Sequence, residues 1–148
     1  MFIGTHEHTL DTKGRVSMPN RFREALGTDK EVVITTNLDP DCACLVVYPM
    51  AEWQAFVDRL DRGADFDPNA IRLNRLVMAT ATVCALDKQG RVLIPPMLRE
   101  YAGLTRDVLW AGVGRKCEIW DKARFVAEHE RARRELPEIT RALAARKG

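Results

Sequence analysis

The segment DTKGRVSMPNRFR, residues 11–23, returns in a related form as DKQGRVLIPPMLR at residues 87–99. A shift of 76 positions superimposes Asp, Gly, Arg, Pro and Arg of the two segments. A second match, shifted by 72 positions, sets VVYPMAEW (46–53) over EIWDKARF (118–125). Special residues repeated in the same order over this length indicate an internal duplication that covers most of both halves of the chain. The matched pairs are Asp11/Asp87, Gly14/Gly90, Arg15/Arg91, Pro19/Pro95, Arg23/Arg99, Glu24/Glu100 and Gly27/Gly103.

Each copy of this segment predicts a β-hairpin that leads into a short helix. Residues of alternating polarity flank the turns DTKG and DKQG, in EHTLD and RVSMP of the first copy and in TVCALD and RVLIP of the second. Asp favours the first turn position because its carboxylate accepts a nearby backbone N–H, and Gly favours the last because it adopts positive φ without strain. Pro19 and Pro95 lack the N–H that a strand ladder needs, so they predict the end of a strand and the start of a helix that Gly27 or Gly103 terminates.

The remainder of each copy predicts two more strands and a longer helix. The strands are EVVIT and CLVVYP in the first copy, and DVLWAGV and CEIW in the second. The long helix of the second copy begins at Asp121, a favourable N-cap. The expected division is a first repeat at 1–66 (core about 6–49, helix about 50–62), a connecting helix at 67–79, a second repeat at 80–136 (core about 81–120, helix about 121–136), and a helix-prone tail at 137–148 that can fray or serve as a partner surface.

The duplication favours a fold in which the two halves share one core. A single four-stranded unit would bury little apolar surface, and isolated hairpins are marginal in water. If the hairpins of one half interlock with those of the other, the strand edges are paired and the apolar faces meet. The expected fold class is therefore mixed α+β and β-rich, with one small intertwined barrel of pseudo-twofold symmetry and flanking helices.

The composition is that of an ordinary globular protein, with 46% hydrophobic and 30% charged residues. No run approaches the roughly 18 consecutive apolar residues of a membrane span, and the start MFIGTHEHTL does not resemble a signal peptide, so we expect a cytoplasmic protein. Four cysteines are too few to indicate a disulfide scaffold in a chain of this length. Residues 1–74 carry 8 basic and 12 acidic side chains, whereas residues 75–148 carry 15 and 9. This asymmetry permits head-to-tail attraction between copies or a basic face on the second half.

In both copies the spacing Asp-x-x-x-Arg places a carboxylate and a guanidinium on the two sides of one turn. One interpretation is structural: Asp11 with Arg15, and Asp87 with Arg91, staple the turns, although an exposed ion pair contributes only about 0–1 kcal/mol. The other interpretation is functional: the Asp holds a guanidinium fork beside a lysine of the same turn, where the fork can bind phosphate or read guanine in a major groove. The spacing alone favours neither interpretation.

Other candidate sites have weaker support. His6, His8, Cys42 and Cys44 suggest a metal site, but their spacing is not that of a zinc module, so no metal is expected. No Ser/His/Asp or Cys/His set, phosphate-binding Gly loop or helical His-Glu pair can be assembled, and we therefore expect no enzyme. The tryptophans are interpreted as core or interface residues: Trp53, Trp110 and Trp120.

Three stretches, MFIGTHEHTLDTKGRVSMPNRFREALG, DKQGRVLIPPMLREYAGL and EIWDKARF, resemble the MraZ family of bacterial transcription regulators. The resemblance covers the chain to about residue 130. It implies tandem swapped-hairpin repeats of the AbrB-like class that form an intertwined barrel, and a ring-shaped homo-oligomer. It also implies binding to direct repeats of double-stranded DNA in the promoter of a division and cell-wall gene cluster, and hence a nucleoid-associated protein. Neither a cofactor, a small-molecule substrate nor a membrane is expected as a partner.

The same resemblance assigns roles to residues of the two turns. Arg15 matches the principal DNA-contacting arginine of the family and Lys13 matches its basic neighbour. Arg91 takes the equivalent place in the second copy, beside Lys88, whereas Gln89 stands where the first copy has Lys13. The alternative function is a protein-interaction module of the antitoxin-like kind, without DNA. The residues expected to shape the turns are Asp11, Gly14, Asp87 and Gly90.

Overall fold

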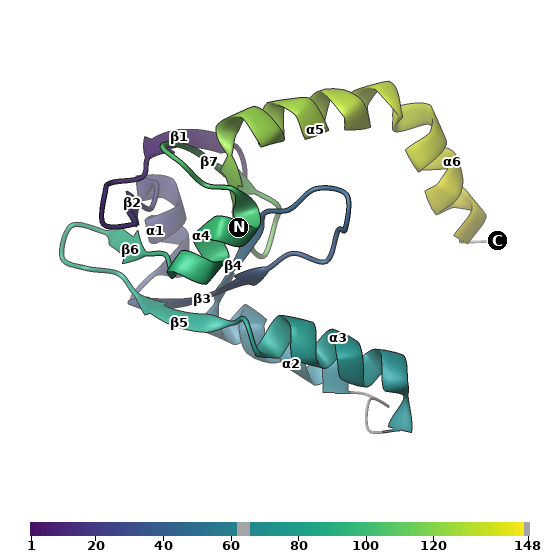
Figure 1. Ribbon diagram of the computed structural model, residues 1–148, viewed down its shortest axis with the longest axis horizontal. Coiled ribbons are helices and arrows are strands. Elements are labelled where there is room, and N and C mark those ends of the chain that lie inside the picture. The colour runs from purple at the N-terminus through teal and green to yellow at the C-terminus, as the bar shows by residue number, and fades with distance from the viewer. Residues whose placement is uncertain (62–65, 147–148) are drawn as a thin grey trace.

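The computed structural model describes residues 1–61 and 66–146 (Figure 1). It is a mixed α/β fold with a six-stranded antiparallel sheet, a two-stranded ribbon and surrounding helices. Both repeats contain elements in the same order, ββαββαα. The first repeat consists of β1 (Thr5–Thr9), β2 (Arg15–Ser17), α1 (Asn20–Leu26), β3 (Glu31–Thr36), β4 (Leu45–Pro49), α2 (Met50–Asp61) and α3 (Pro68–Met78). The second consists of β5 (Thr82–Ala85), β6 (Arg91–Leu93), α4 (Pro96–Ala102), β7 (Asp107–Gly112), β8 (Cys117–Asp121), α5 (Lys122–Arg134) and α6 (Leu136–Arg146).

The two repeats exchange strands. The large sheet has the order β1-β7-β8-β4-β3-β5, so β1 of the first repeat pairs with β7 of the second, and β5 of the second pairs with β3 of the first. The remaining two strands, β2 and β6, pair only with each other. The simple hairpins expected for EHTLD–RVSMP and TVCALD–RVLIP are therefore wrong: each turn connects a strand of the large sheet to a strand of the ribbon. The physical reason is that exchange pairs these short strands across the repeats while their apolar residues enter a shared core.

The main core is built by both repeats together. Its largest fully buried side chain is Trp110 of β7, against which Phe22 of α1 packs with a centroid distance of 6.3 Å. Phe22 also makes edge contacts with the rings of Phe2 and His6. The ribbon covers the same core, since Val16 and Val92 are 1% and 0% exposed. The apolar side chains of both ribbon strands therefore belong to one core to which both halves of the chain contribute.

The longer helices cover other surfaces of the sheet. Trp53 and Phe56 of α2 pack on Tyr48, with ring centroids 5.5 and 5.2 Å from that of Tyr48, and Phe125 of α5 packs edge-on against Trp120. The interpretation of the three tryptophans as core or interface residues is confirmed, since Trp110 and Trp120 are buried and Trp53 joins this aromatic cluster. Figure 1 shows α2 and α3 together on one side and α5 with α6 on the opposite side.

The two C-terminal helices differ in their limits from the expected ones. The helix expected over 121–136 ends at Arg134 and a separate α6 begins at Leu136, because Pro137 has no N–H to continue the hydrogen-bond ladder. The tail is consequently helical as far as Arg146.

The expected connecting helix is observed as α3, with the side chain of Asp67 accepting the Asn69 N–H at its start. Parts of the expected division lie outside the described residues. They are position 62 at the end of the first long helix, positions 63–65 of the first repeat, and positions 147–148 of the tail. Among the described helices, none has the length and apolar character needed to cross a membrane.

Candidate nucleic-acid interface

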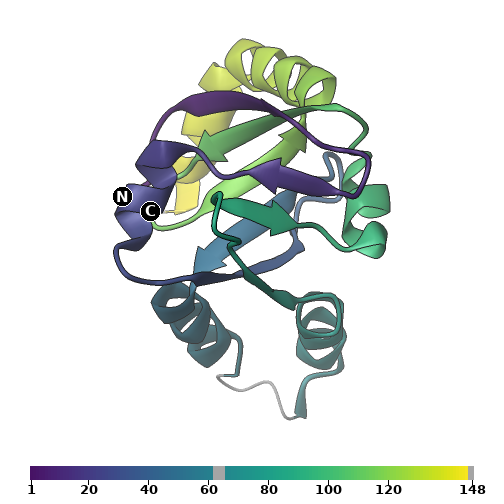
Figure 2. The ribbon, with the colours of Figure 1, turned by 90° about the vertical axis from the view of Figure 1, so that its left-hand side faces the viewer.

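The ribbon formed by β2 and β6 has one buried face and one outward face. Val16 lies opposite Val92, and both side chains enter the core. On either side of this pair, Arg15 lies opposite Leu93 and Ser17 lies opposite Arg91. Because side chains alternate along a strand, Arg15, Arg91 and the 57%-exposed Leu93 occupy the outward face. In Figure 2 this ribbon lies at the front of the molecule, between the two pairs of long helices.

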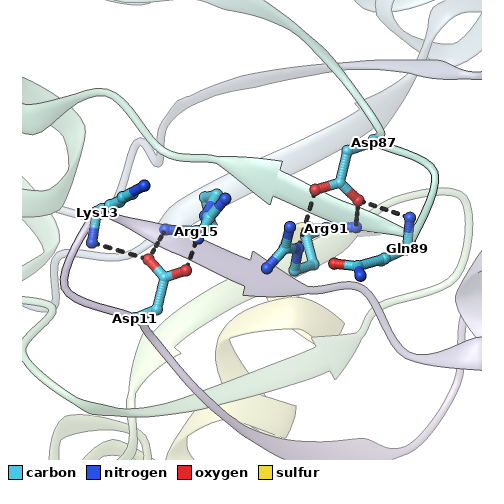
Figure 3. A network of polar contacts seen from close by, with 6 residues as sticks. All are labelled: Asp11, Lys13, Arg15, Asp87, Gln89 and Arg91. Atoms are coloured by element: carbon cyan, nitrogen blue, oxygen red, sulfur yellow. Dashed lines mark hydrogen bonds and ion pairs between the residues drawn. The ribbon is translucent and has the colours of Figure 1, made fainter.

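The two arginines are diagonal neighbours on the ribbon. Arg15 begins β2 and Arg91 begins β6, and in the antiparallel register each arginine lies across from the residue two positions beyond the partner arginine. Diagonal neighbours of this kind are about 7–8 Å apart. One arginine from each repeat is thereby presented on a single face (Figure 3).

Arg15 is held by the aspartate at the start of its turn, in an arrangement of hydrogen bonds that we call the clasp. Asp11 Oδ1 accepts hydrogen bonds from the backbone N–H groups of Lys13 and Arg15, each at 2.9 Å, and Asp11 Oδ2 accepts one from Arg15 Nε at 2.7 Å. The backbone closes the same turn, since the Gly14 N–H donates to the Asp11 carbonyl and the Asp11 N–H donates to that of Arg15. Gly14 has φ 87°, a value that glycine adopts without the steric cost of a Cβ.

The second copy repeats this clasp. Asp87 Oδ1 accepts from the backbone N–H groups of Gln89 and Arg91, and Asp87 Oδ2 accepts from Arg91 Nε at 2.9 Å. Gly90 has φ 76°. The side chains of Arg15 and Arg91 are 32% and 29% exposed, so both guanidinium groups are held at the surface and neither is sunk in the body of the protein.

The clasp fixes both the charge of the aspartate and the orientation of the arginine. The backbone N–H of Arg15 is the largest cause that lowers the pKa of Asp11, to about 2, with further contributions from the Arg15 side chain and the Lys13 N–H. The backbone N–H of Arg91 and its side chain likewise lower the pKa of Asp87. Of the guanidinium nitrogens of each arginine, Nε bonds to the aspartate, and within residues 1–61 and 66–146 there is no acceptor for the terminal nitrogens of Arg15 or Arg91. Two terminal N–H groups of a planar fork are what a phosphate or a guanine edge requires.

The lysines expected at the site lie beside the clasps. Lys13 is exposed in the first turn and Lys88 in the second. They do not occupy equivalent positions, because Gln89 takes the place of Lys13 in the second turn (Figure 3). Both turns therefore combine a clasped arginine with a lysine, but in different geometry.

The sequence-based interpretation missed the shared face and the helix arginines that reach the turns. It considered each Asp-x-x-x-Arg unit within its own hairpin, whereas the exchange of strands puts Arg15 and Arg91 on one ribbon. The repeat pairs Arg23 with Arg99 and indicates no role for either, yet they lie against the glycines of the opposite turns. The available signal was that an arginine recurs at the same distance from the turn in both copies.

The residues considered for a metal site are not brought together. The His6 ring packs edge-on against Phe22 at 5.0 Å, and Cys44 is fully buried beside Trp120. Among the described residues, one group of three side chains has donor atoms that all lie within 4.8 Å of one another: Asp39, Cys42 and Glu128.

This donor group contains no histidine and is already internally bonded. Cys42 Sγ donates to Asp39 at 2.9 Å, and Glu128 pairs with Arg131 at 2.7 Å. Burial, followed by the hydrogen bond to Asp39, raises the pKa of the Cys42 thiol to about 12.

Comparison with known families identifies the duplication independently. The family model described as "MraZ protein, putative antitoxin-like" matches the chain twice, over residues 1–76 and over residues 77–146. The boundary between the two matches falls within α3, at the end of the first ββαββαα unit. The matched unit is thus the one that exchanges strands with its twin.

Curated relatives cover most of the chain. "Transcriptional regulator MraZ" of Lachnoclostridium phytofermentans is 46% identical over 125 residues, which is 84% of each chain. The protein of the same name from Thermomicrobium roseum is 41% identical over 144 residues, 97% of this chain and 98% of the relative. That of Legionella pneumophila is 39% identical over 130 residues, 88% of this chain and 86% of the relative.

Proposed function

The chain belongs to the MraZ family, and from this premise we propose that it is a DNA-binding transcriptional regulator whose contact surface is the outward face of the β2–β6 ribbon. The family expected from the repeated motif is confirmed, and the relatives carry the name of a regulator. The observation that carries the proposal is that Arg15 and Arg91 share one face of the ribbon, each bonded to an aspartate through Nε, with no acceptor for the terminal nitrogens among the described residues.

A ribbon of this kind suits duplex DNA. The major groove admits a two-stranded β-ribbon, and a guanidinium fork can donate two hydrogen bonds to guanine or grip a phosphate. The exposed Leu93 offers an apolar contact for a thymine methyl group between the two arginines. We assign Arg15 and Lys13 as the principal contacts, with Arg91 and Lys88 as the secondary ones.

The aspartates and glycines of the turns have a structural part in this proposal. Asp11 and Asp87 orient the arginines without neutralising their outward edges, and Gly14 and Gly90 permit the turn that brings the two residues together. The rigid fork loses little freedom when it binds, which favours affinity.

The finer proposal is a ring of copies bound to direct repeats, each copy folded as an AbrB-like swapped-hairpin barrel. The exchange of strands between the repeats supports the barrel. Exposed apolar side chains on α3 and α6, among them Leu76 and Leu143, support self-association. One ribbon with few cations binds weakly, but linked copies on successive DNA repeats raise the effective concentration without a new type of contact. A protein acting in this way belongs in the cytoplasm, at the nucleoid.

The test is a binding titration on the DNA upstream of the gene that encodes the chain, at several salt concentrations. Loss of a bidentate arginine contact costs about 1–3 kcal/mol, so Arg15→Ala should weaken binding by about 10- to 100-fold. Arg91→Ala should weaken it less, because the second turn carries Gln89 in place of a lysine. Arg115→Ala, an exposed arginine outside the ribbon, is the matched control and should bind like the unchanged protein.

Size-exclusion chromatography with light scattering shows whether each variant keeps the assembly state of the unchanged protein. If Arg15→Ala retains full affinity in the normal assembly, the ribbon is not the DNA-binding surface. In that case the protein-interaction module becomes the better proposal.

A further inference from the structure

The glycines of the two turns are buried although the turns protrude. Gly14 follows the exposed Lys13, and Gly90 follows the exposed Gln89, yet both glycines are buried. Each is covered by the guanidinium of a helix arginine. A Cβ placed on Gly14 would lie 2.7 Å from Arg99 Cζ and 2.9 Å from Arg99 Nε. Arg99 therefore rests directly on the backbone of the first turn.

The cover is crossed between the repeats. Arg99 belongs to α4 of the second repeat and covers the turn of the first, whereas Arg23 belongs to α1 of the first repeat and covers Gly90 in the turn of the second. A Cβ on Gly90 would lie 2.6 Å from Arg23 Cζ. Each turn is thus covered by an arginine that belongs to the other repeat.

Two hydrogen bonds at Ile94 link Arg99 to the first turn. The Ile94 N–H donates to the Gly14 carbonyl at 2.9 Å, and the Ile94 carbonyl accepts a bond from Arg99 Nε at 3.0 Å. The guanidinium of Arg99 lies against the Cα of Gly14. The last residue of the first turn is consequently fixed on its carbonyl side by Ile94 and on its Cα side by Arg99.

The second turn has the same cover without the same bond. The Met18 N–H donates to the Gly90 carbonyl at 2.9 Å, as Ile94 does to Gly14. Arg23, however, donates from a terminal nitrogen to the side chain of Asn20, and its buried Nε finds no partner in the described part of the chain. The second repeat has Pro96 at the position of Asn20, which leaves Arg99 no such competitor. We call the contact of a helix arginine with the glycine of the opposite turn a brace. The difference between Asn20 and Pro96 explains why the arginine Nε is bonded to a carbonyl in the first brace but not in the second.

We infer that Arg99 is a positioning residue for the DNA-contacting Arg15, and that Arg23 has the same but weaker role for Arg91, so that each repeat steadies the contact residue of the other. This inference rests on the proposed function for its DNA readout only. The crossed support of the turns can be measured on the free protein.

Amide hydrogen exchange tests the crossed support in the free protein. Arg99→Lys keeps the charge but removes the planar Nε donor, so the Lys13 and Arg15 amides of the first turn should exchange about five- to tenfold faster, the factor for one lost hydrogen bond. The Gln89 and Arg91 amides should be unchanged. Arg23→Lys should affect the second turn instead, and by a smaller factor.

Arg21→Lys is the matched control, since Arg21 is exposed on the same helix as Arg23 and should alter neither turn. The inference is overturned if Arg99→Lys leaves the first turn as protected as before. It is also overturned if both turns loosen equally, because that pattern indicates general destabilisation rather than a brace.

DNA binding separates a positioning residue from a direct phosphate contact. As a positioning residue, Arg99 replaced by Lys should lower affinity about five- to tenfold with the salt dependence unchanged, since no phosphate contact is lost. As a direct contact, Arg99→Lys should keep full affinity, and Arg99→Met should reduce the salt slope by about one; that result overturns the inference. If Arg15→Ala binds DNA normally, the proposed function fails, while the exchange pattern still decides whether the brace exists.

Discussion

The aspartates of the turns Asp11–Gly14 and Asp87–Gly90 each accept the same three hydrogen bonds, two of them from the arginine, but the two turns are supported differently. The first turn carries a lysine next to its glycine, and the arginine that covers it is bonded through Nε to a carbonyl. The second turn carries glutamine at that position, and the Nε of its covering arginine has no partner among the described residues. Duplication has thus preserved the clasp while the surroundings of the clasp have diverged.

This difference separates the parts of the site that serve geometry from those that serve affinity. The Asp–Arg clasp is present in both turns, and both ribbon strands need it to present an arginine on the outward face. The third turn position and the brace differ, and both differences favour the first turn. We therefore expect the first turn to dominate binding and to be the more rigid of the two.

The largest expected difference between the turns concerns their glycines. Gly14→Ala places a Cβ in left-handed backbone, which costs about 1–2 kcal/mol, and it also displaces the bonded Arg99, which adds roughly 1 kcal/mol for the lost hydrogen bond. Gly90→Ala displaces Arg23 in the same way, but it should cost less, because the Nε of Arg23 has no hydrogen bond to lose among the described residues. The free energy of unfolding in urea measures both.

Gly114→Ala provides the control for positive φ without a covering arginine. Gly114 has φ 101°, and among the described residues no atom lies within 4 Å of the position of its added Cβ. Equal destabilisation by the substitutions at Gly14 and Gly114 would show that the contact with Arg99 adds nothing to stability.

Much of this architecture follows from the repeated segment. Turn chemistry located Gly14 and Gly90, the prolines located the starts of α1 and α4, and Asp121 located the start of α5, where its side chain accepts the Arg124 N–H. These predictions succeed because they depend on local backbone requirements that single residue types satisfy.

The strand partners did not follow from local rules. Nothing in EHTLD or RVSMP distinguishes pairing within a hairpin from pairing with the other half, because both arrangements bury the same alternating residues. The choice is decided by the large apolar residues that both halves contribute to one core, such as Trp110 and Phe22. The crossed brace depends on that choice, and for this reason Arg23 and Arg99 had no visible role in the sequence.

The next expected difference concerns the third turn position. Lys13→Gln removes one cation from the first turn, which should weaken DNA binding by about fivefold and reduce the slope of log affinity against log salt by about one. The reciprocal change, Gln89→Lys, should strengthen binding by a similar factor if the second turn also approaches the phosphates. The comparison is made by measuring DNA affinity at several salt concentrations for both single variants and for the double variant Lys13→Gln with Gln89→Lys.

The outcome for Gln89→Lys sharpens the assignment of roles. An increase in both affinity and slope places the second turn on the DNA. No change in either would contradict the proposed secondary contacts of Arg91 and Lys88, and would restrict binding to the first turn.

The smallest expected effect is on the titration of the two aspartates. Since hydrogen bonds lower the pKa of Asp11 to about 2, against about 3.9 for an unperturbed Asp, the stability contributed by its ionised form should be complete above about pH 5 and should be lost progressively as the pH falls from there through 2. Stability from this group is therefore independent of pH between neutrality and about pH 5. Carboxyl carbon NMR should show Asp11 and Asp87 both titrating below an unperturbed aspartate.

Arg15→Ala tests which part of the clasp sets this value. The backbone N–H of residue 15 is the largest cause of the lowered pKa, and an alanine retains it, so the pKa of Asp11 should rise only part of the way to its ordinary value. A complete return would mean that the turn itself opens when the guanidinium is removed. The arginine would then hold the aspartate as much as the aspartate holds the arginine, and loss of DNA binding in Arg15→Ala would reflect a lost turn as well as a lost contact.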